Sequence, residues 1–294
     1  MSERHPIIAI TGSSGAGTTS VTRTFDNIFR REKVRAAIVE GDSFHRYDRQ
    51  EMRQRQLAAE RDGNRHFSHF GPENNLFAEL EQLFRSYGET GSGRHRKYLH
   101  DPLEAAPYKQ EPGTFTPWED LSADTDLLFY EGLHGAVVTE QVNVARYPDL
   151  LIGVVPVINL EWIQKLWRDQ HVRGYSTDAV TDTILRRMPD YVNYICPQFA
   201  HTHVNFQRVP VVDTSNPFIA RDIPAASESL CVIRFANPKG IDFPYLLSMI
   251  HDSFMSRANT IVVPGGKMEL AMQLIFTPFI WRMMERRREA TGAL

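Results

Sequence analysis

A glycine-rich run near the N-terminus constrains the fold of this chain more than any other feature. The run TGSSGAGTTS at residues 11–20 follows four apolar residues at 7–10 and precedes a helical pattern at 21–31. A buried strand, a glycine-rich turn and a helix in this order form a phosphate-binding loop, in which backbone N–H groups and the helix N-terminus hold phosphate oxygens. The order therefore predicts an α/β fold with a nucleotide site at the end of its first strand.

This loop lacks the lysine that phosphate-binding loops of the kind usually carry. Thr18 occupies the lysine position, and Thr19 occupies the position of the Ser/Thr that binds Mg²⁺. Positive charge on the transferred phosphoryl group must then come from elsewhere in the chain. An ordinary glycine-rich turn is the alternative, which the position directly after a strand disfavours. The residues expected to hold the nucleotide are Gly12, Ser13, Ser14, Gly15, Ala16, Gly17, Thr18, Thr19 and Ser20.

Predicted strands alternate with helical patterns along the chain, which favours an α/β fold with a mostly parallel sheet flanked by helices. We expect one P-loop kinase domain over 1–294, of the nucleoside-triphosphate-hydrolase type, with an irregular inserted segment near 88–124 and a lid helix in a region near 160–190. The runs predicted as strands are 7–10, 36–39, 127–130, 150–157, 209–212, 230–235 and 260–263.

Composition excludes several classes of protein. Lys and Arg number 33 against 36 Asp and Glu, so the net charge of −3 gives no basis for a nucleic-acid surface. No run approaches the roughly 18 apolar residues of a membrane-spanning helix, and the first strand leaves no room for a signal peptide. The only cysteines, Cys196 and Cys231, suit a reducing cytoplasm, and both are expected to be buried because they lie in apolar runs.

Two acidic residues follow predicted strands. Asp42 comes after the second strand and Glu131 ends the strand at 127–130, so both are expected at the edge that carries the phosphate-binding loop. Asp42 could accept the proton of a hydroxyl that attacks the γ-phosphorus, although an Asx-turn or helix cap is an alternative role for it. Glu131 has the position of a Walker B acid, which lies near Mg²⁺.

The segment WIQKLWRDQHVRG at 162–174 has the spacing of a helix with one polar stripe. Lys165, Asp169 and Arg173 lie four residues apart, opposite an apolar side that includes Trp167, and Arg168 lies beside them. A solvated helix face would look similar. Because the loop lacks its lysine, we expect instead a lid helix that closes over the nucleotide and supplies cations. Gly174 would be its hinge or C-cap.

Together these residues resemble the uridine kinase and phosphoribulokinase group of P-loop kinases, and the bacterial phosphoribulokinases most closely. The resemblance covers nearly the whole chain. It implies ATP-dependent phosphorylation of the C1 hydroxyl of D-ribulose 5-phosphate, which gives ribulose 1,5-bisphosphate, the CO₂ acceptor of the Calvin cycle. The stretches that carry it are 11–19, 40–46, 129–135, 154–164, 208–216 and 240–245.

The resemblance also implies roles for single residues. Asp42 would be the catalytic base and Asp169 a second catalytic carboxylate, with Thr19 and Glu131 near Mg²⁺. Arg168 and Arg173 would face the ATP phosphates. The residues expected to contact the sugar phosphate are His45, Arg49, Tyr98, His100 and Lys165.

Regulation differs within the family that the chain resembles. The plant form is switched by a disulfide at the phosphate loop, and this chain has no cysteine before Cys196. The bacterial form is activated by NADH, is inhibited by AMP and assembles into a large homo-oligomer such as an octamer. Arg31, Arg234 and Arg257 resemble its effector-site arginines, with plain surface arginines as the alternative.

Two other functions fit the residues. A related kinase could act on a nucleoside or another sugar, and a nucleotide-sensing regulatory protein could share the fold. A sensor would not need the base Asp42. A phosphorylated substrate needs cations for its resident phosphate, which a nucleoside does not, and the residues that could supply them are Arg49, Arg94, Arg96, His100 and Lys165.

Overall fold

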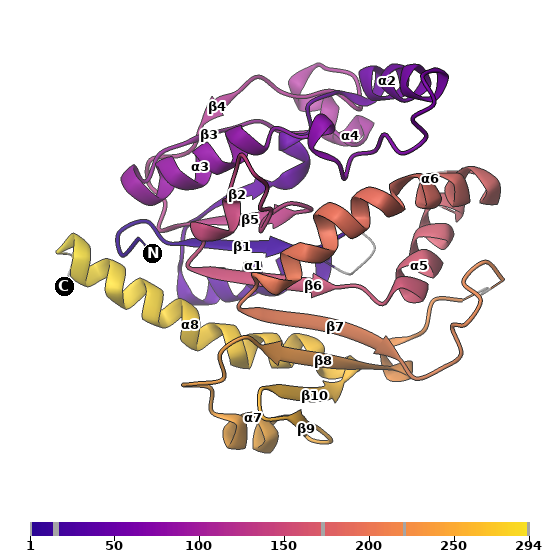
Figure 1. Cartoon of the computed structure of the whole chain (residues 1–294). Coiled ribbons are helices and arrows are strands. Elements are labelled where there is room, and N and C mark those ends of the chain that lie inside the picture. The colour runs from indigo at the N-terminus through magenta and orange to yellow at the C-terminus, as the bar shows by residue number, and fades with distance from the viewer. Residues whose placement is uncertain (1, 14–17, 172–173, 220–221, 293–294) are drawn as a thin grey trace.

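A mixed sheet of eight strands organises the structure, which is a computed structural model that describes residues 2–13, 18–171, 174–219 and 222–292, with only the backbone described at 18–20 (Figure 1). The strand order is β2-β5-β1-β6-β7-β8-β10-β9; the first five run parallel, and β8, β10 and β9 add antiparallel pairings. The strands are β1 (Ile7–Thr11), β2 (Ala36–Glu40), β5 (Leu127–Gly132), β6 (Leu150–Val155), β7 (Val204–Pro210), β8 (Ser229–Phe235), β9 (Phe254–Arg257) and β10 (Thr260–Pro264).

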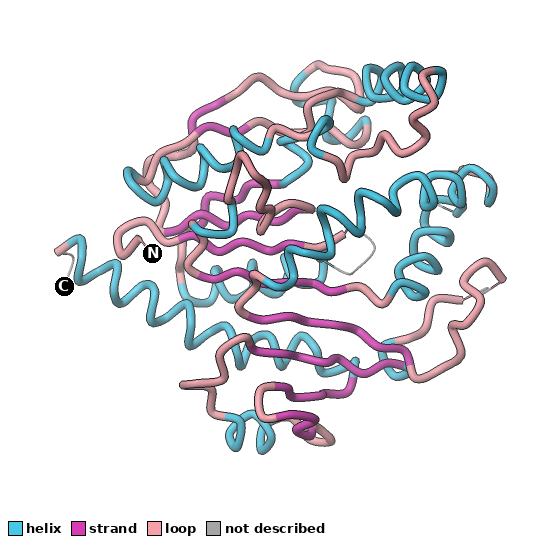
Figure 2. The backbone as a smooth tube through the Cα atoms, viewed as in Figure 1, coloured by secondary structure: helices cyan, strands magenta, loops and turns pink. Residues whose placement is uncertain are grey.

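Helices cover both faces of the sheet, as the tube view shows (Figure 2). Helices α1, α7 and α8 pack on one face, and α3 packs on the other face over β1, β2 and β5. The helices are α1 (Thr18–Glu32), α2 (Arg49–Arg61), α3 (Phe77–Thr90), α4 (Pro102–Ala105), α5 (Ile158–His171), α6 (Thr177–Asp190), α7 (Phe243–Met249) and α8 (Met268–Thr291). The predicted α/β class with a mostly parallel, helix-flanked sheet is confirmed.

Strand β1 shows why the first strand reads as a continuous apolar run. Its side chains alternate between two cores: Ile8 and Ile10 face α1 and α8, while Ile7 and Ala9 face α3. A parallel strand that is buried on both faces needs apolar residues at every position. The chain leaves β1 at Thr11 and enters α1 at Thr18, so the strand and the helix predicted on either side of the loop are confirmed.

One predicted strand was misplaced. The run at 209–212 was expected as a strand, whereas β7 begins at Val204 and ends at Pro210, and Val211 and Val212 are exposed. The pattern missed the start of β7 because polar Asn205 interrupts it. The Asn205 amide is buried and satisfied, since it donates to the carbonyl of Phe199 and accepts from the Thr202 hydroxyl at 2.6 Å.

The segment expected to be irregular, 88–124, is largely irregular in the structure. Helix α3 extends into it as far as Thr90, and two short strands, β3 (Arg94–His95) and β4 (Glu119–Asp120), pair at its base. Tyr98 forms an isolated bridge with Phe115. The segment therefore folds back on itself beside the end of β2, which makes it one wall of the candidate site.

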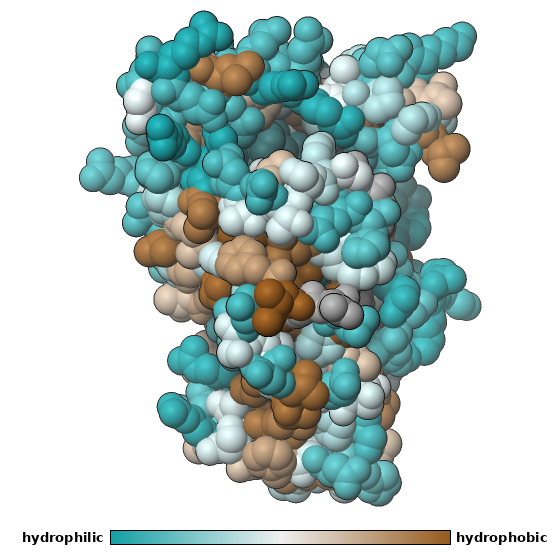
Figure 3. Space-filling model, turned by 90° about the vertical axis from the view of Figure 1, so that its right-hand side faces the viewer, coloured by the Kyte–Doolittle hydropathy of each residue, from teal (hydrophilic) through white to brown (hydrophobic). Residues whose placement is uncertain are grey.

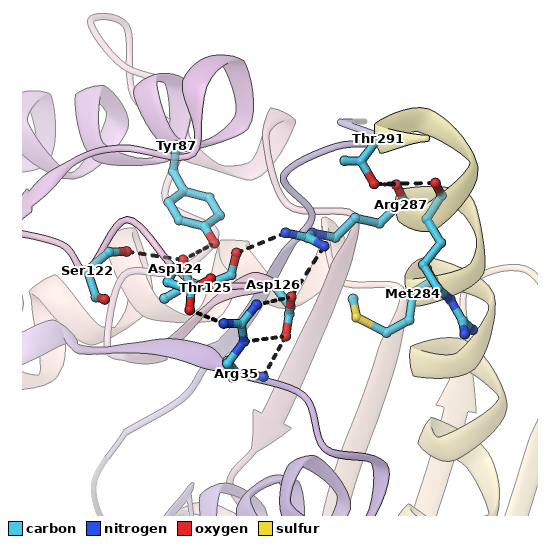
Figure 4. Close-up of polar contacts among 10 residues, drawn as sticks. Arg35, Tyr87, Ser122, Asp124, Thr125, Asp126, Met284, Arg287 and Thr291 are labelled. Atoms are coloured by element: carbon cyan, nitrogen blue, oxygen red, sulfur yellow. Dashed lines mark hydrogen bonds and ion pairs between the residues drawn. The ribbon is translucent and has the colours of Figure 1, made fainter. Parts of the chain in front are cut away.

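A cluster of charges fastens helix α8 to the sheet at the end opposite the phosphate loop (Figure 4). Asp126, just before β5, accepts from the backbone N–H of Arg35 at 2.9 Å and pairs with the Arg35 and Arg287 guanidinium groups at 3.3 and 3.2 Å. Arg287, on α8, also donates to the carbonyl of Thr125, whose hydroxyl contacts Tyr87 at 2.9 Å. The cluster joins α8, α3 and the strands β2 and β5.

The two cysteines differ in environment. Cys231 lies in the core, where burial raises the pKa of its thiol to about 12. The expectation that Cys196 is buried was wrong: it is exposed. The prediction failed because the chain forms a short π-helix (Tyr191–Ile195) and then a 3₁₀ helix (Cys196–Ala200), in which Ile195 rather than Cys196 is buried. Across the described residues, no helix is long and apolar enough to cross a membrane.

Candidate active site

The root of the phosphate loop lies at the carboxyl end of β1, beside β5. The Gly12 N–H donates to the carbonyl of Gly132 at 3.2 Å, and the Thr11 hydroxyl contacts Gln198 Oε1 at 2.8 Å. Ser13 donates from its hydroxyl to Glu161 of α5. Of the predicted nucleotide contacts, Ser14, Gly15, Ala16 and Gly17 lie outside the described residues, and the structure describes only the backbone of Thr18, Thr19 and Ser20, which open helix α1.

Asp42 lies in a 3₁₀ turn (Gly41–Phe44) that follows β2, on the same edge as the loop. The Asp42 side chain is 38% exposed, so a substrate can reach it. Its carboxylate lies 3.2 Å from His45 Nε2 and 3.6 Å from His100 Nε2. Desolvation opposes ionisation, but His45, followed by His100 and His69, outweighs it and holds the pKa of Asp42 well below its usual range. Asp42 is therefore a carboxylate at neutral pH.

Two glycines bring the Asp42 turn against the end of β5. A Cβ on Gly132 would lie 2.6 Å from the Gly41 Cα, and a Cβ on Gly41 would lie 2.5 Å from the Tyr130 hydroxyl. Neither position can take a side chain without a shift of backbone. Since Glu131 precedes Gly132 and pairs in register with Glu40, this approach sets Asp42 and Glu131 on neighbouring strand ends.

The inserted segment contributes a second group of side chains beside Asp42. Arg49, at the start of α2, donates to the carbonyl of His100 at 2.8 Å, and the Tyr98 and His100 rings meet edge to face at 4.8 Å. Burial raises the pKa of Tyr98 although Arg49 lies near it, so its hydroxyl stays protonated. The structure thus brings four predicted substrate residues, His45, Arg49, Tyr98 and His100, around one carboxylate.

Arg96 and Arg94, which could have bound a substrate phosphate, contact other residues of the chain instead. Arg96 donates to the carbonyls of Ser43 and His45 at 2.9 and 2.6 Å, and its guanidinium lies over the Phe115 ring at 3.6 Å. Arg94 contacts Asp120 and the carbonyl of Trp118. Arg96 therefore supports the turn that carries Asp42, although the sequence had suggested Arg96 as a cation for the substrate phosphate.

The region predicted to be a lid comprises α5 and α6, which pack together. Asp169 is buried, not part of a solvated stripe, and it pairs with Lys165 and, at 3.0 Å, with Arg168. Burial opposes ionisation, but these two cations lower the pKa of Asp169. Burial and Arg187 lower the pKa of Lys165 to about 8 despite the pair. Arg173 lies outside the described residues.

Two features of the lid differ from the predicted pattern. Trp167, expected on the apolar side, is 41% exposed and stacks on His171 with ring centroids 5.0 Å apart. The apolar side of α5 is instead the side that faces α6, where Trp162 and Leu166 pack. Gly174, expected as a hinge or C-cap, has a φ of +71°, in the left-handed region that favours glycine, and its N–H donates to the carbonyl of Gln170.

A small cavity of about 30 Å³ lies where the lid meets the phosphate loop. Ser13, Glu161, Lys165 and Arg187 line it, together with Phe70 and Tyr191. Burial raises the pKa of Glu161. Sequence reasoning missed Glu161 and Arg187, and the only available signal was the Arg186–Arg187 pair in a chain whose loop needs a cation. Figure 3 looks onto this end of the molecule, which is hydrophilic above and carries apolar surface around its middle.

The predicted effector arginines do not meet within one chain. Arg31 ends α1 on the face covered by α8, where it donates to the Thr277 hydroxyl at 2.8 Å. Arg234 alternates with the core residues Ile233 and Phe235 and so points to the opposite face. Arg234 and Arg257 both pair in register with Thr260, from the strands on either side of it.

A larger cavity of about 990 Å³ lies at the other end of the sheet, between the N-terminal residues, the turn after β8 and α8. The described residues that line it include Arg4, Lys239, Arg282 and Phe279 but none of the predicted site residues. The chemistry predicted from the sequence is therefore concentrated at the carboxyl ends of the parallel strands, where doubly wound α/β proteins bind ligands.

Comparison with known proteins agrees with this placement. Residues 7–215 match the model of a family described as "Phosphoribulokinase / Uridine kinase family". A protein named "Phosphoribulokinase, chromosomal" from Cupriavidus necator is 81% identical over 290 residues, which cover 99% of each chain. "Probable phosphoribulokinase" from Escherichia coli is 59% identical over 98% of this chain and 99% of its own. A solved phosphoribulokinase from Rhodobacter spheroides superposes with a TM-score of 0.90 at 60% identity, covering 98% of this chain and 100% of that one.

Proposed function

The chain belongs to the phosphoribulokinase and uridine kinase family, and from this premise we propose how its site works. The enzyme transfers the γ-phosphoryl group of ATP to the C1 hydroxyl of D-ribulose 5-phosphate and releases ADP and D-ribulose 1,5-bisphosphate, a reaction of the Calvin cycle. The observation that carries this function is full-length identity of 59–81% to proteins named phosphoribulokinase. The two alternatives, a nucleoside or other sugar kinase and a nucleotide sensor, are not favoured.

Asp42 acts as the general base in this proposal. Its carboxylate is ionised, reachable from solvent and surrounded by residues suited to a sugar phosphate. A low pKa makes it a weak base, but phosphoryl transfer has a loose transition state in which bond formation lags, so orientation of the hydroxyl counts more than basicity. Asp42 would hold the C1 hydroxyl in line with the γ-phosphorus and take its proton late.

The nucleotide phosphates would lie on residues 12–20 and the N-terminus of α1. Glu131 and the Thr19 hydroxyl would hold Mg²⁺. Hard oxygen donors in small number fit this ion, which usually takes one or two protein ligands and completes its shell with phosphate oxygens and water. When bound, Mg²⁺ would neutralise charge on the phosphate oxygens and orient them for in-line attack.

Cations of the lid would replace the missing loop lysine. Arg168 is half-buried beside Asp169, and Arg187 lines the cavity that opens onto Ser13. With Arg173, they would face the phosphates when the lid closes, and Asp169 would fix Lys165 and Arg168 for that contact. The sugar phosphate would contact Arg49, His45, Tyr98, His100 and Lys165.

Regulation and assembly follow the bacterial pattern in this proposal. NADH would activate and AMP would inhibit through Arg31, Arg234 and Arg257, and the enzyme would form a large homo-oligomer in the cytoplasm. Because Arg31 and Arg234 lie on opposite faces of the sheet, an effector that contacts all three arginines would bridge two copies of the chain.

A coupled assay tests the function. Purified protein is incubated with ATP, Mg²⁺ and either ribulose 5-phosphate, uridine or fructose 6-phosphate, and ADP release is followed. We expect ADP only with ribulose 5-phosphate, and the product should be ribulose 1,5-bisphosphate by mass spectrometry. Faster turnover of uridine would restore the nucleoside kinase alternative, and ATP binding without any turnover would restore the sensor.

A further inference from the structure

The side-chain amide of Asn75 is buried beside the site, and its nitrogen and its oxygen both have hydrogen-bond partners. The residue is 3% exposed. Its Nδ2 donates to the carbonyls of His69 and Gly71, at 2.8 and 2.7 Å. Both amide hydrogens are thereby used, so the orientation of the amide is fixed and its Oδ1 must point the other way. That oxygen lies 2.9 Å from His45 Nδ1.

The backbone holds the two residues together independently of their side chains. His45 and Asn75 form an antiparallel bridge, in which the Arg46 N–H donates to Asn74 and the Leu76 N–H donates to Phe44, both at 2.8 Å. The contact between the side chains is thus built into the turn that carries Asp42, rather than made by two mobile groups.

The amide determines which nitrogen of His45 carries a proton. Because Asn75 Oδ1 can only accept, His45 Nδ1 must donate to it. Nε2, the other nitrogen, lies 3.2 Å from the Asp42 carboxylate. In a neutral ring protonated at Nδ1, the lone pair of Nε2 would face a negative oxygen, which is repulsive. Protonation of Nε2 converts this into a charge-assisted hydrogen bond.

We propose that Asn75 is a positioning residue for the catalytic base: it holds His45 as an imidazolium, and the imidazolium orients the Asp42 carboxylate toward the substrate hydroxyl. The proposal rests on the proposed function, in which Asp42 is the base. It assigns His45 a role toward Asp42 beyond contact with the sugar phosphate.

The charged and titratable neighbours of His45 agree with a cation at this point. Burial disfavours the imidazolium, but Asp42 and Asn75 outweigh it and raise the pKa of His45. The His69 ring lies tilted against His45, with ring centroids 4.7 Å apart. Burial, followed by His45, lowers the pKa of His69, so it is neutral. His134, in the turn after β5, donates from Nε2 to the carbonyl of Phe70 at 3.0 Å, and it is also neutral because burial lowers its pKa to about 3. Arg187 on α6 opposes the charge, and His100 adds to the field on Asp42.

The test compares Asn75→Leu and Asn75→Asp with a matched control, Asn74→Leu. Asn74 is the preceding residue, equally buried, and its amide donates to the Ser68 carbonyl in the same turn. The readouts are thermal unfolding, kcat, the KM for ATP, and the pH profile of kcat/KM for ribulose 5-phosphate. Loss of orientation at the base should lower kcat of Asn75→Leu by about 10- to 100-fold, with the KM for ATP nearly unchanged.

The pH profile separates positioning from simple damage. Deprotonation of His45 should produce the basic limb of the wild-type profile. Asn75→Asp keeps an oxygen that accepts from Nδ1, while its second oxygen takes the place of the amide that donated to the carbonyls of His69 and Gly71. Its negative charge beside Nδ1 should move that limb to higher pH, whereas Asn75→Leu removes the acceptor and should move it to lower pH. Asn74→Leu should keep the wild-type midpoint, even where its stability falls.

Each outcome bears on the proposal. Opposite shifts of the basic limb in the two Asn75 variants support it. If Asn75→Leu does not fold, the shift of the limb in Asn75→Asp alone decides. Unchanged midpoints in both, or equal effects in Asn74→Leu, would overturn it while leaving the proposed function intact. A wild-type protein that does not phosphorylate ribulose 5-phosphate would overturn the function itself, and the inference with it.

Discussion

Gly132 approaches Gly41 so closely that a Cβ on Gly132 would lie 2.6 Å from the Gly41 Cα. This contact places the turn of Asp42 beside the end of the strand that carries Glu131. Gly132→Ala should therefore push the two strand ends apart. We expect a loss of about 1–3 kcal/mol in the free energy of unfolding, as in overpacked cores, and a larger relative loss of kcat. Urea unfolding and steady-state kinetics measure the two effects.

The control is Gly266→Ala, where a Cβ would meet nothing within 4 Å. It should leave stability within about 0.5 kcal/mol and activity near wild type. A Gly132→Ala enzyme with wild-type kcat would show that the spacing of the two carboxylates is not critical.

Asp42→Asn keeps the shape of the side chain but cannot accept a proton. Removal of a general base should lower kcat by roughly 10²–10⁴-fold. ATP binding, measured by calorimetry, should stay near wild type because the ion-pair partners of Asp42 among the described residues are His45 and His100. A variant that retains more than a tenth of kcat would exclude Asp42 as the base.

Arg187→Ala tests whether a lid cation replaces the loop lysine. If Arg187 stabilises charge in the transition state, its loss should cost about 2–4 kcal/mol in kcat/KM. Arg168→Ala should behave in the same way. The matched control is the neighbouring Arg186→Ala, which loses ion pairs to Glu60 and Asp182 but does not line the cavity at Ser13. Equal losses in Arg186→Ala and Arg187→Ala would mark both as structural.

Asp126→Asn should destabilise the protein in a pH-dependent way. Burial opposes ionisation, but Arg35 and Arg287 lower the pKa of Asp126 in the folded state. The stabilisation is then fully present above the unfolded pKa of about 3.9 and is lost as pH falls through the folded value. We expect Asp126→Asn to cost about 1–3 kcal/mol at pH 7, and the difference from wild type to shrink below about pH 4.

Asp124→Asn is the control, because its side chain is 79% exposed and contacts the same Arg35. A surface pair of this kind contributes about 0–1 kcal/mol. If the difference between Asp126→Asn and wild type were constant from pH 3 to 7, the charge of Asp126 would not be its source.

Arg31→Ala tests the effector hypothesis. Initial rates at low ATP should rise with NADH in wild type and fall with AMP, with a coupling of about 1–3 kcal/mol. Arg31→Ala should abolish the response and keep basal activity. The control is Arg30→Ala, one residue earlier, whose guanidinium donates to Asn27 Oδ1 on the same helix; it should respond as wild type. Indifference of the wild type to NADH would exclude this mode of control.

Sequence reasoning located the parts of the site that follow local rules. Asp42 and Glu131 were found because acids at the ends of parallel strands share an edge of the sheet, and both strands formed where predicted. Asn75, Glu161 and Arg187 carry no local motif; each meets its partner only after distant segments pack. The side of α5 that faces α6 was misjudged at Trp167 because the spacing of a helix gives its faces but not the neighbour that each face contacts.

The strand pairing also determines when the site can form. Ile7 of β1 pairs with Leu128 of β5, more than a hundred residues further along the chain, whereas β8, β9 and β10 pair within a short stretch near the C-terminus. Contacts between distant segments form slowly because closing a long loop costs entropy. The strand that leads into the phosphate loop, β1, therefore has no neighbour in the sheet until the distant strands β5 and β6 are in place. Folding intermediates in which only β8, β9 and β10 have paired should therefore be unable to bind ATP.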